Sequence, residues 1–233
     1  VTTMFTSSTH ENVVFFSDKG KIYRLKGYEI PESTRAAKGT NIINLLPIEQ
    51  GEKITEAIRN NVDVDENHYL VMCTRKGIIK RTRMIEFANL RKKGMAAITL
   101  DEGDTLEYVA ITEGNSDLIV ATHDGRAIRF NENEVRSAGR TARGMRAVLM
   151  NEENFVVGMA VVTEHEQLLT VSEDGLGRRS NFSDYPIKHR GGQGVANTHR
   201  GVNIAGIRAV KETDDVICIT DSGIMIRMAV RDV

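Results

Sequence analysis

A short stretch of the sequence, YPIKHRGGQGV, places Lys188, His189 and Arg190 directly before a run that contains three glycines. Glycine lets backbone amide groups approach a ligand closely, and flanking cations add positive charge, so this stretch could bind a phosphate group. An ordinary basic turn would have the same composition. The choice depends on whether the stretch belongs to a larger pattern in the chain.

Other kinds of site have little support in the sequence. It contains no G-x-S-x-G, P-loop or H-E-x-x-H motif, and its six histidines lack the spacing of metal ligands. Cys73 and Cys218 lie in apolar, strand-like runs, which predicts reduced core residues and no disulfide. Tryptophan is absent and aromatic residues make up 5%, which disfavours stacking of single-stranded bases. We therefore expect no catalytic residue, no metal and no cofactor in this domain.

Composition indicates a globular protein. Of 233 residues, 40% are hydrophobic and 27% are charged, and no apolar run is long enough to span a membrane. Without a signal peptide, the protein is expected in the cytoplasm. The chain starts with valine, so we expect a piece of something longer. A net charge of -1 counts against nucleic-acid binding unless the cations gather on one surface.

The chain repeats itself. Five segments align on one glycine each, here called the anchor glycine, with separations of 57, 48, 50 and 48 residues. Three residues before each anchor stands a serine or threonine, four after it an arginine, nine after it an acid, and ten after it an apolar or aromatic residue. The anchors are Gly20, Gly77, Gly125, Gly175 and Gly223. Agreement at four positions in all five segments indicates one repeated structural unit.

Each unit is expected to be a four-stranded sheet. The runs around the anchors are short, rich in β-branched residues and broken by turns such as TRKG and THDG, which predicts hairpins with a left-handed glycine. A basic stretch and two more apolar runs follow. Radial repetition of such sheets gives an all-β, propeller-like domain over residues 1–233. The expected units are 12–59, 68–112, 117–163, 166–210 and a partial 214–233, with residues 1–8 as the last strand of a preceding unit.

The cations cluster within each unit. They occupy the first hairpin and the stretch that follows, while acids such as Glu49, Asp101 and Glu152 occupy the turn between the last two strands. In a radial array these sets would form a basic belt and a separate acidic rim, and a curved belt suits duplex DNA. Arg83 and Arg136 belong to the belt. The candidate DNA-binding residues are Lys21, Arg24, Arg35, Lys38, Lys80, Arg81, Arg91, Lys92, Lys93, Arg126, Arg129, Arg140, Arg143, Arg178, Arg179, Lys188, His189, Arg190, Gly191, Gly192 and Gly194.

A purely structural role remains open for part of this set. The arginine after each anchor and the acid that follows it could form a repeated salt bridge within one blade. The loops RKKG and HRGGQG have few acids nearby in the sequence, and this favours phosphate contact there.

Repeats of this length, the segment PESTRAAKGTNIINLLPIEQGEKI and the loop HRGGQG together resemble the C-terminal domain of the A subunit of DNA gyrase. The resemblance covers the whole chain. It implies a six-bladed β-pinwheel, of which this chain would hold part, that wraps duplex DNA around a basic rim. In that family a gyrase box, Q-[KR]-R-G-G-[KR]-G, lies in the first blade. Here residues 188–194 keep the arginine, the two adjacent glycines and the last glycine, but in the fourth complete unit.

By this resemblance the domain itself is not an enzyme, but part of an ATP-dependent type II DNA topoisomerase. Its partners would be double-stranded DNA, the rest of the gyrase A chain and the gyrase B chain in an A2B2 assembly at the bacterial nucleoid, with the isolated domain monomeric. The imperfect box leaves the related domain of topoisomerase IV as an alternative. Two other classes stay open, namely a scaffold that binds an acidic protein and an enzyme that acts on a phosphorylated substrate.

Overall fold

The computed structural model describes residues 5–34, 36–60 and 66–233, and it is all-β apart from short 3₁₀ turns. The strands are β1 (Asn12–Ser17), β2 (Lys21–Lys26), β3 (Ile54–Asn60), β4 (Tyr69–Thr74), β5 (Ile78–Arg83), β6 (Met95–Ala96), β7 (Leu106–Thr112), β8 (Asp117–Thr122), β9 (Arg126–Asn131), β10 (Met145–Arg146), β11 (Val156–Val161), β12 (Gln167–Ser172), β13 (Gly177–Asn181), β14 (Val195–Ala196), β15 (Ile204–Val210), β16 (Asp215–Ile219) and β17 (Met225–Ala229). The 3₁₀ turns are η1 (Gly27–Glu29), η2 (Ile42–Asn44), η3 (Met84–Phe87), η4 (Glu132–Glu134), η5 (Phe182–Asp184) and η6 (Val230–Asp232).

Each unit begins with a tight hairpin, as predicted. All five anchor glycines have a positive φ, for example +81° at Gly77, where the amide donates to the carbonyl oxygen of Thr74 at 3.0 Å. The hydroxyl three residues before the anchor closes the same turn, because Thr74 Oγ1 accepts from the amide of Ile78 at 3.0 Å. The recurring serine or threonine is therefore explained by the turn.

The fourth strand of each blade comes from the next unit. The sheets have the orders β3-β1-β2-β6, β10-β5-β4-β7 and β11-β8-β9-β14, so β6, β10 and β14 each pair with the blade before their own unit. The prediction that one unit folds into one four-stranded blade is wrong in this respect. The exchanged strands are two residues long, and their pairing, such as Met95 with Ile22, depends on the path of the preceding basic loop.

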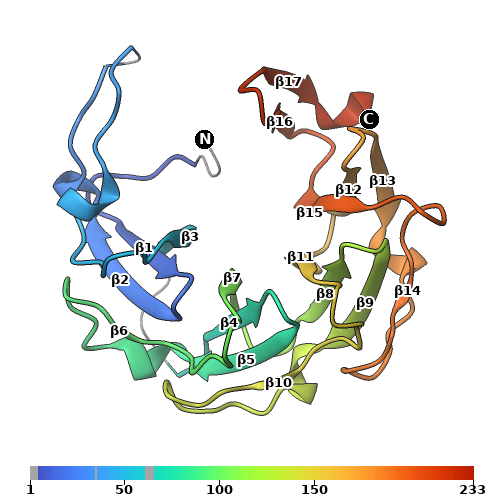
Figure 1. The fold of residues 1–233 in the computed structure, drawn as a ribbon, viewed down its shortest axis with the longest axis horizontal. Helices are drawn as coiled ribbons and strands as arrows, with labels where there is room; N and C mark the ends of the chain where they lie inside the picture. The colour runs from blue at the N-terminus through green and yellow to red at the C-terminus, as the bar shows by residue number, and fades with distance from the viewer. Residues whose placement is uncertain (1–4, 35, 61–65) are drawn as a thin grey trace.

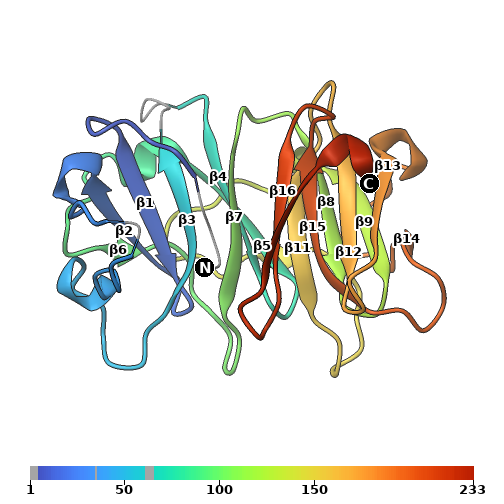
Figure 2. The ribbon, with the colours of Figure 1, turned by 90° about the horizontal axis from the view of Figure 1, so that it is seen from above.

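The blades follow one another around an incomplete ring (Figure 1). Strands β3, β7, β11 and β15 line its inside, and β6, β10 and β14 lie on its outer perimeter. Seen from above, the strands run from one flat face of the ring toward the other (Figure 2). The last described blades are smaller, with the order β13-β12-β15 and the hairpin β16-β17.

The hydrophobic core lies between neighbouring blades. Strand β4 is buried on both faces: Leu70 and Met72 pack toward the first blade, while Val71 and Cys73 pack toward the third. Because successive side chains of a strand point to opposite faces, one continuous apolar run can serve two interfaces. The predicted core cysteines are both free thiols, Cys73 buried and Cys218 half-buried.

Two further expectations concern a strand at the start of the chain and the absence of a membrane-spanning segment. Of the strand predicted at residues 1–8, residues 5–8 form no strand, and residues 1–4 lie outside the described part. Among the described residues, no helix has the length and apolar character needed to cross a membrane.

Candidate nucleic-acid interface

The basic stretches form loops on the outside of the ring. The loops of the second, third and fourth units each follow a 3₁₀ turn and lead into an exchanged strand, so they cross onto the preceding blade (Figure 1). The loop before β14 holds residues 185–194, and the equivalent loop before β10 holds residues 135–144. These loops therefore place positive charge along the perimeter and also join consecutive blades.

The glycine-rich loop is tied to the preceding unit through Glu134. One carboxylate oxygen accepts from the amide of Arg190 at 2.7 Å, and the other lies 3.3 Å from His189 Nδ1. The guanidinium of Arg190 donates to the carbonyl oxygens of Glu134, at 3.3 Å, and Arg146. Arg190 therefore holds the loop in place through the Nε and Nη1 atoms of its guanidinium group.

The glycines of this loop do not all serve the purpose that the sequence suggested. Gly191 and Gly194 have φ angles of +82° and +73°, whereas Gly192 does not have a positive φ. A Cβ atom at Gly194 would lie 2.5 Å from the carbonyl oxygen of Ala127, while one at Gly192 would make ordinary contacts of 3.4 Å or more. The close backbone approach is thus toward the neighbouring strand, at Gly194, whereas Gly191 favours glycine through its positive φ alone.

Several donors of the loop remain available to a ligand. Lys188 is exposed and makes no side-chain hydrogen bond or ion pair within the described residues. The amides of Gly192 and Gln193 likewise have no backbone acceptor there. Free backbone amides beside a cation are donors from which a phosphate oxygen could accept.

The basic loops have more acidic neighbours than the sequence suggested. Arg143 forms an ion pair with Asp101 in the acidic turn of the preceding unit, and Lys92 lies 3.7 Å from Glu29. The hydrogen bond from Arg143 lowers the pKa of Asp101 below its ordinary value. The expectation of an acidic rim separate from the basic belt is therefore wrong, because each loop crosses onto the blade that carries those acids.

Lys80 lies inside the protein and is not part of an interface. It is 1% exposed, and its ammonium group donates to the carbonyl oxygens of Ala97, at 2.6 Å, and Arg140. Burial, together with the positive charge of Arg140, lowers the pKa of Lys80 to about 8. A buried ammonium cannot reach a phosphate, so Lys80 leaves the candidate set.

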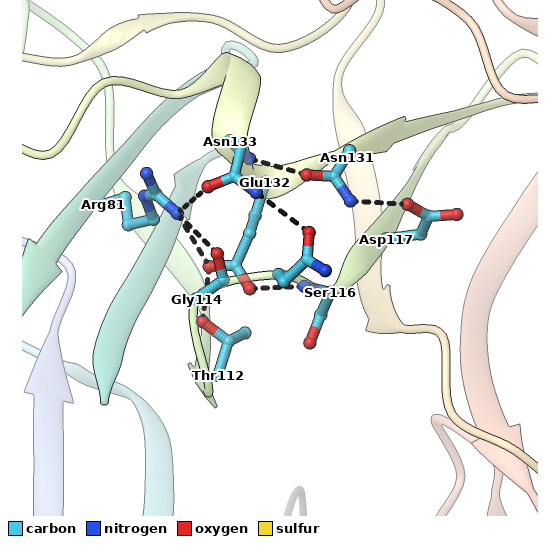
Figure 3. Close-up of polar contacts among 9 residues, drawn as sticks. Arg81, Thr112, Gly114, Ser116, Asp117, Asn131, Glu132 and Asn133 are labelled. Atoms are coloured by element: carbon cyan, nitrogen blue, oxygen red, sulfur yellow. Dashed lines mark hydrogen bonds and ion pairs between the residues drawn. The ribbon is translucent and has the colours of Figure 1, made fainter. Parts of the chain in front are cut away.

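The arginines four residues after Gly77, Gly125 and Gly175 are engaged in the structure too. Arg81 is 7% exposed and contacts Glu132, Asn133 and the carbonyl oxygen of Gly114 (Figure 3). Arg129 pairs with Asp117 at 2.7 Å, and Arg179 donates to the carbonyl oxygen of Val233 at 3.0 Å. Arg81, Arg129 and Arg179 therefore leave the candidate DNA-binding set as well.

The alternative of a salt bridge between each arginine and the acid nine residues after the anchor is not realised for Arg81, Arg129 and Arg179, whose partners are other groups. The acid instead caps its own 3₁₀ turn, as where the amide of Lys26 donates to Glu29 at 2.8 Å and that of Asn181 to Asp184 at 3.1 Å. In the third unit the acid is Glu134, which holds the next unit's loop.

The other predicted residues divide by exposure. Arg35 lies outside the described residues. Half-buried positions are Lys21, Arg24, Arg126, Arg140, Arg190, Gly191, Gly192 and Gly194, and exposed positions are Lys38, Arg91, Lys92, Lys93, Arg143, Arg178, Lys188 and His189. Some of these cations have partners, since Lys21 forms an ion pair with Glu49 and Arg178 donates to the carbonyl oxygen of Asn197 at 2.8 Å.

Sequence reasoning missed one exposed cation of the perimeter. Arg146 lies in the exchanged strand β10, and the equivalent residues of β6 and β14 are Ala96 and Ala196. The repeat therefore carried no signal for it. The exposed perimeter cations without an ion pair or side-chain hydrogen bond, within the described residues, are Lys38, Arg83, Arg91, Lys93, Arg136, Arg146 and Lys188.

Comparisons with known proteins agree with the propeller-like fold described above. The family described as "DNA gyrase C-terminal domain, beta-propeller" matches residues 11–61, 68–113, 116–163, 166–211 and 214–233. The DNA gyrase A chain of Clostridium acetobutylicum is 51% identical over the whole of this chain, and that of Staphylococcus epidermidis is 38% identical. The chain spans 28% and 27% of the length of these relatives.

Solved structures give the same result. A structure of the DNA gyrase A C-terminal domain superimposes with a TM-score of 0.82 at 26% identity, over 97% of this chain and 75% of that one. The crystal structure of the C-terminal domain of DNA topoisomerase IV gives a TM-score of 0.83 at 24% identity, over 97% and 71%, which shows a shared fold alone. The sequence relatives named above are gyrase chains and not topoisomerase IV, the predicted alternative. The chain therefore belongs to the family of DNA gyrase C-terminal domains.

Proposed function

We propose that this domain binds duplex DNA along its outer perimeter and bends it, chiefly through contacts to phosphate groups. The observation that carries the proposal is the set of exposed perimeter cations without acidic partners, which includes Arg83, Arg91, Lys93, Arg136 and Lys188. They belong to consecutive units and lie on loops and strand ends that follow the curve of the ring. A polyanion that follows the same curve could contact each unit in turn.

The chemistry of these contacts favours phosphate over bases. The cations lie on several loops and strand ends, and each offers charge without a recognition helix or strand that could enter a groove. The free amides of Gly192 and Gln193 add donors that suit a phosphate oxygen. We therefore expect little dependence on DNA sequence and a strong dependence on salt.

Family membership supports a role for this domain in a larger enzyme. In the longer protein, DNA bent around the perimeter would be presented to the DNA-passage machinery of a type II topoisomerase. The domain would then assist ATP-dependent negative supercoiling by an assembly of gyrase A and gyrase B chains, without contributing a catalytic residue. This assembly would act on DNA at the bacterial nucleoid.

Salt-dependent binding tests the proposal. Arg91 and Lys93 are exposed and unpaired in one loop, so replacing both by alanine removes two charges with little effect on packing. The slope of log K against log salt should flatten by about 0.9 for each phosphate that is no longer neutralised, or roughly two units in total. Duplex affinity would be measured by fluorescence anisotropy across a series of salt concentrations.

A matched control carries the same change of charge at a different place. Arg208 and Lys211 are exposed, belong to the inner strand β15 or its end, and Arg208 lines the hollow at the centre of the ring. The double alanine variant of these two residues should keep the parent's slope. Equal slopes for the parent and the Arg91/Lys93 variant, or a flattened slope in the control alone, would contradict binding along the perimeter.

A further inference from the structure

Three of the arginines that stand four residues after an anchor glycine, Arg81, Arg129 and Arg179, join their own blade to the next unit. Arg129 shows this most clearly, because its Nε and Nη2 atoms donate to Asp117 Oδ2 at 2.9 and 2.7 Å within the hairpin β8-β9. Its remaining nitrogen, Nη1, donates to the carbonyl oxygen of Phe182 at 2.7 Å, in η5 of the following unit. One guanidinium group thus spans two units.

The same arrangement recurs in the next joint with different chemistry. Arg179 donates to Gln167 Oε1 at 3.3 Å within its hairpin, and to the carbonyl oxygens of Val233 and Arg231 at 3.0 and 3.4 Å in the following unit. Gln167 and Asp117 both stand eight residues before their anchor glycine, so the partner within the hairpin is positionally equivalent. The partner within the hairpin is therefore defined by its position in the blade, and it can be either a carboxylate or an amide.

The joint between the second and third units uses a buried carboxylate. Arg81 lies over the ring of Tyr69, 4.5 Å from its centre, and contacts Glu132 Oε2 at 3.4 Å in η4 of the following unit. Glu132 is fully buried and also accepts from Thr112 Oγ1 at 2.6 Å and the amide of Ser116 at 2.7 Å (Figure 3). These donors satisfy the carboxylate and fix the 3₁₀ turn against the preceding blade.

The position of each 3₁₀ turn determines where the next basic loop starts. The loop begins directly after the turn, and its backbone is held by the same strand residue: the amide of Lys188 donates to the carbonyl oxygen of Arg129 at 2.8 Å. Likewise the amide of Ala138 donates to the carbonyl oxygen of Arg81 at 2.9 Å. Side chain and backbone of one arginine thus hold the basic loop of the following unit.

We propose that Arg81, Arg129 and Arg179 are positioning residues that set the angle between consecutive units, and thereby the bend that the perimeter imposes on DNA. The bend is part of the proposed function, on which this inference rests. A planar guanidinium with donors on several sides can hold two units in one geometry, whereas a lysine ammonium is a point charge on a flexible stem. Loss of the second contact should loosen the joint while the unit itself stays folded.

A pair of conservative substitutions isolates the second contact. Arg227 donates to Asp215 Oδ2 through Nε and Nη2, just as Arg129 does to Asp117, but its side chain is 72% exposed and it contacts no further unit within the described residues. Arg129→Lys can keep the ion pair with Asp117 and loses the bond to Phe182. Arg227→Lys makes the same chemical change at a side chain that contacts no second unit within the described residues.

The measurements are DNA bending, by energy transfer between fluorophores on the two ends of a duplex, and small-angle scattering of the free protein. Arg129→Lys should reduce energy transfer at saturating protein and broaden the distance distribution of the free domain. Arg227→Lys should leave both unchanged. Arg179→Lys, at a half-exposed joint whose acceptors are Gln167 and backbone oxygens, should behave like Arg129→Lys and replaces it if that variant does not fold.

The outcomes separate the two proposals. Unchanged scattering and unchanged energy transfer in the folded Arg129→Lys and Arg179→Lys variants would overturn the positioning role. The same decrease in energy transfer and the same broadening of the distance distribution in Arg227→Lys would do so as well, because replacement of any such arginine by lysine would then produce the effect without a joint contact. If the parent fails to bind DNA while Arg129→Lys still broadens the scattering distribution, the proposed function fails and the role of the arginines in the joint stands.

Discussion

The buried ammonium group of Lys80 should make the protein more stable as the pH rises from about 7.5 to about 9.5. Its partners are two carbonyl oxygens, those of Ala97 and Arg140, and no carboxylate lies within ion-pair distance among the described residues. Burial and the charge of Arg140 lower the pKa of Lys80 to about 8 in the folded protein, against 10.5 for an ordinary lysine. The folded state therefore carries a penalty for the charged form.

The direction follows from the proton balance. Between the two pKa values the unfolded chain keeps a proton that the folded protein releases, and stability rises with pH wherever the unfolded state binds more protons. Integrated over this range, Lys80 contributes an increase of about 2 kcal/mol in the free energy of unfolding. Cys73 acts in the opposite direction, because burial raises its thiol pKa and the unfolded chain ionises first.

A comparison with Lys80→Met removes the contribution of Cys73, which both proteins share. Urea unfolding followed by circular dichroism at several pH values gives the free energy of unfolding of each. The parent should gain about 2 kcal/mol more than Lys80→Met across the range, and the exposed Lys93→Met control should behave like the parent. If Lys80→Met and the parent show the same pH dependence, the ammonium group is not titrating as the structure implies.

Two further changes test the local geometry. Gly194→Ala should cost at least about 2 kcal/mol of stability, because Gly194 has a positive φ and a Cβ there would lie 2.5 Å from the carbonyl oxygen of Ala127. Gly192→Ala should cost less than about 1 kcal/mol, because its Cβ would make ordinary contacts. Equal melting temperatures for the two variants would refute this. Asn12→Asp should stabilise the domain by about 1 kcal/mol, because the new carboxylate could form an ion pair with Arg24, which lines the same cavity of about 30 Å³. In the parent, Asn12 Oδ1 is buried without a hydrogen bond. The equivalent position in the third unit already holds an acid, Asp117, which pairs with Arg129. A lower midpoint of thermal unfolding would show that desolvation of the new carboxylate outweighs the ion pair.

The hairpins and the class of fold could be predicted from the sequence because their causes are local. A hydroxyl, an anchor glycine and flanking β-branched residues specify a tight turn and two strands within about a dozen residues. The exchange of strands between units could not be predicted in the same way. Strand β10, Met145–Arg146, is too short to carry a pattern, and whether it pairs within its own unit depends on the three-dimensional path of the loop before it.

The role of the recurring arginines also required the structure. Phosphate binding and a structural link both favour arginine, so its recurrence in the sequence does not distinguish between the two roles. A signal was present eight residues before the anchor, where Asp117, Gln167 and Asp215 stand diagonally across the hairpin from their arginines. Diagonal neighbours in an antiparallel pair lie within reach of long side chains, so the register of the hairpin would have identified this partner.

Strict and loose recurrence mark different functions in this chain. The joint arginines Arg81, Arg129 and Arg179 each stand four residues after their anchor, since each must meet one partner within its hairpin and another in the next unit. The unpaired perimeter cations Lys38, Arg91, Arg136 and Lys188 stand at different distances from their anchors. A contact with phosphate needs charge near a continuous polyanion and tolerates such shifts, because the DNA backbone offers a phosphate at short intervals along its length. A joint between two protein surfaces does not tolerate them. The positions that repeat most exactly in sequence are therefore the ones that build the ring, and the cations that repeat approximately are those expected to contact DNA.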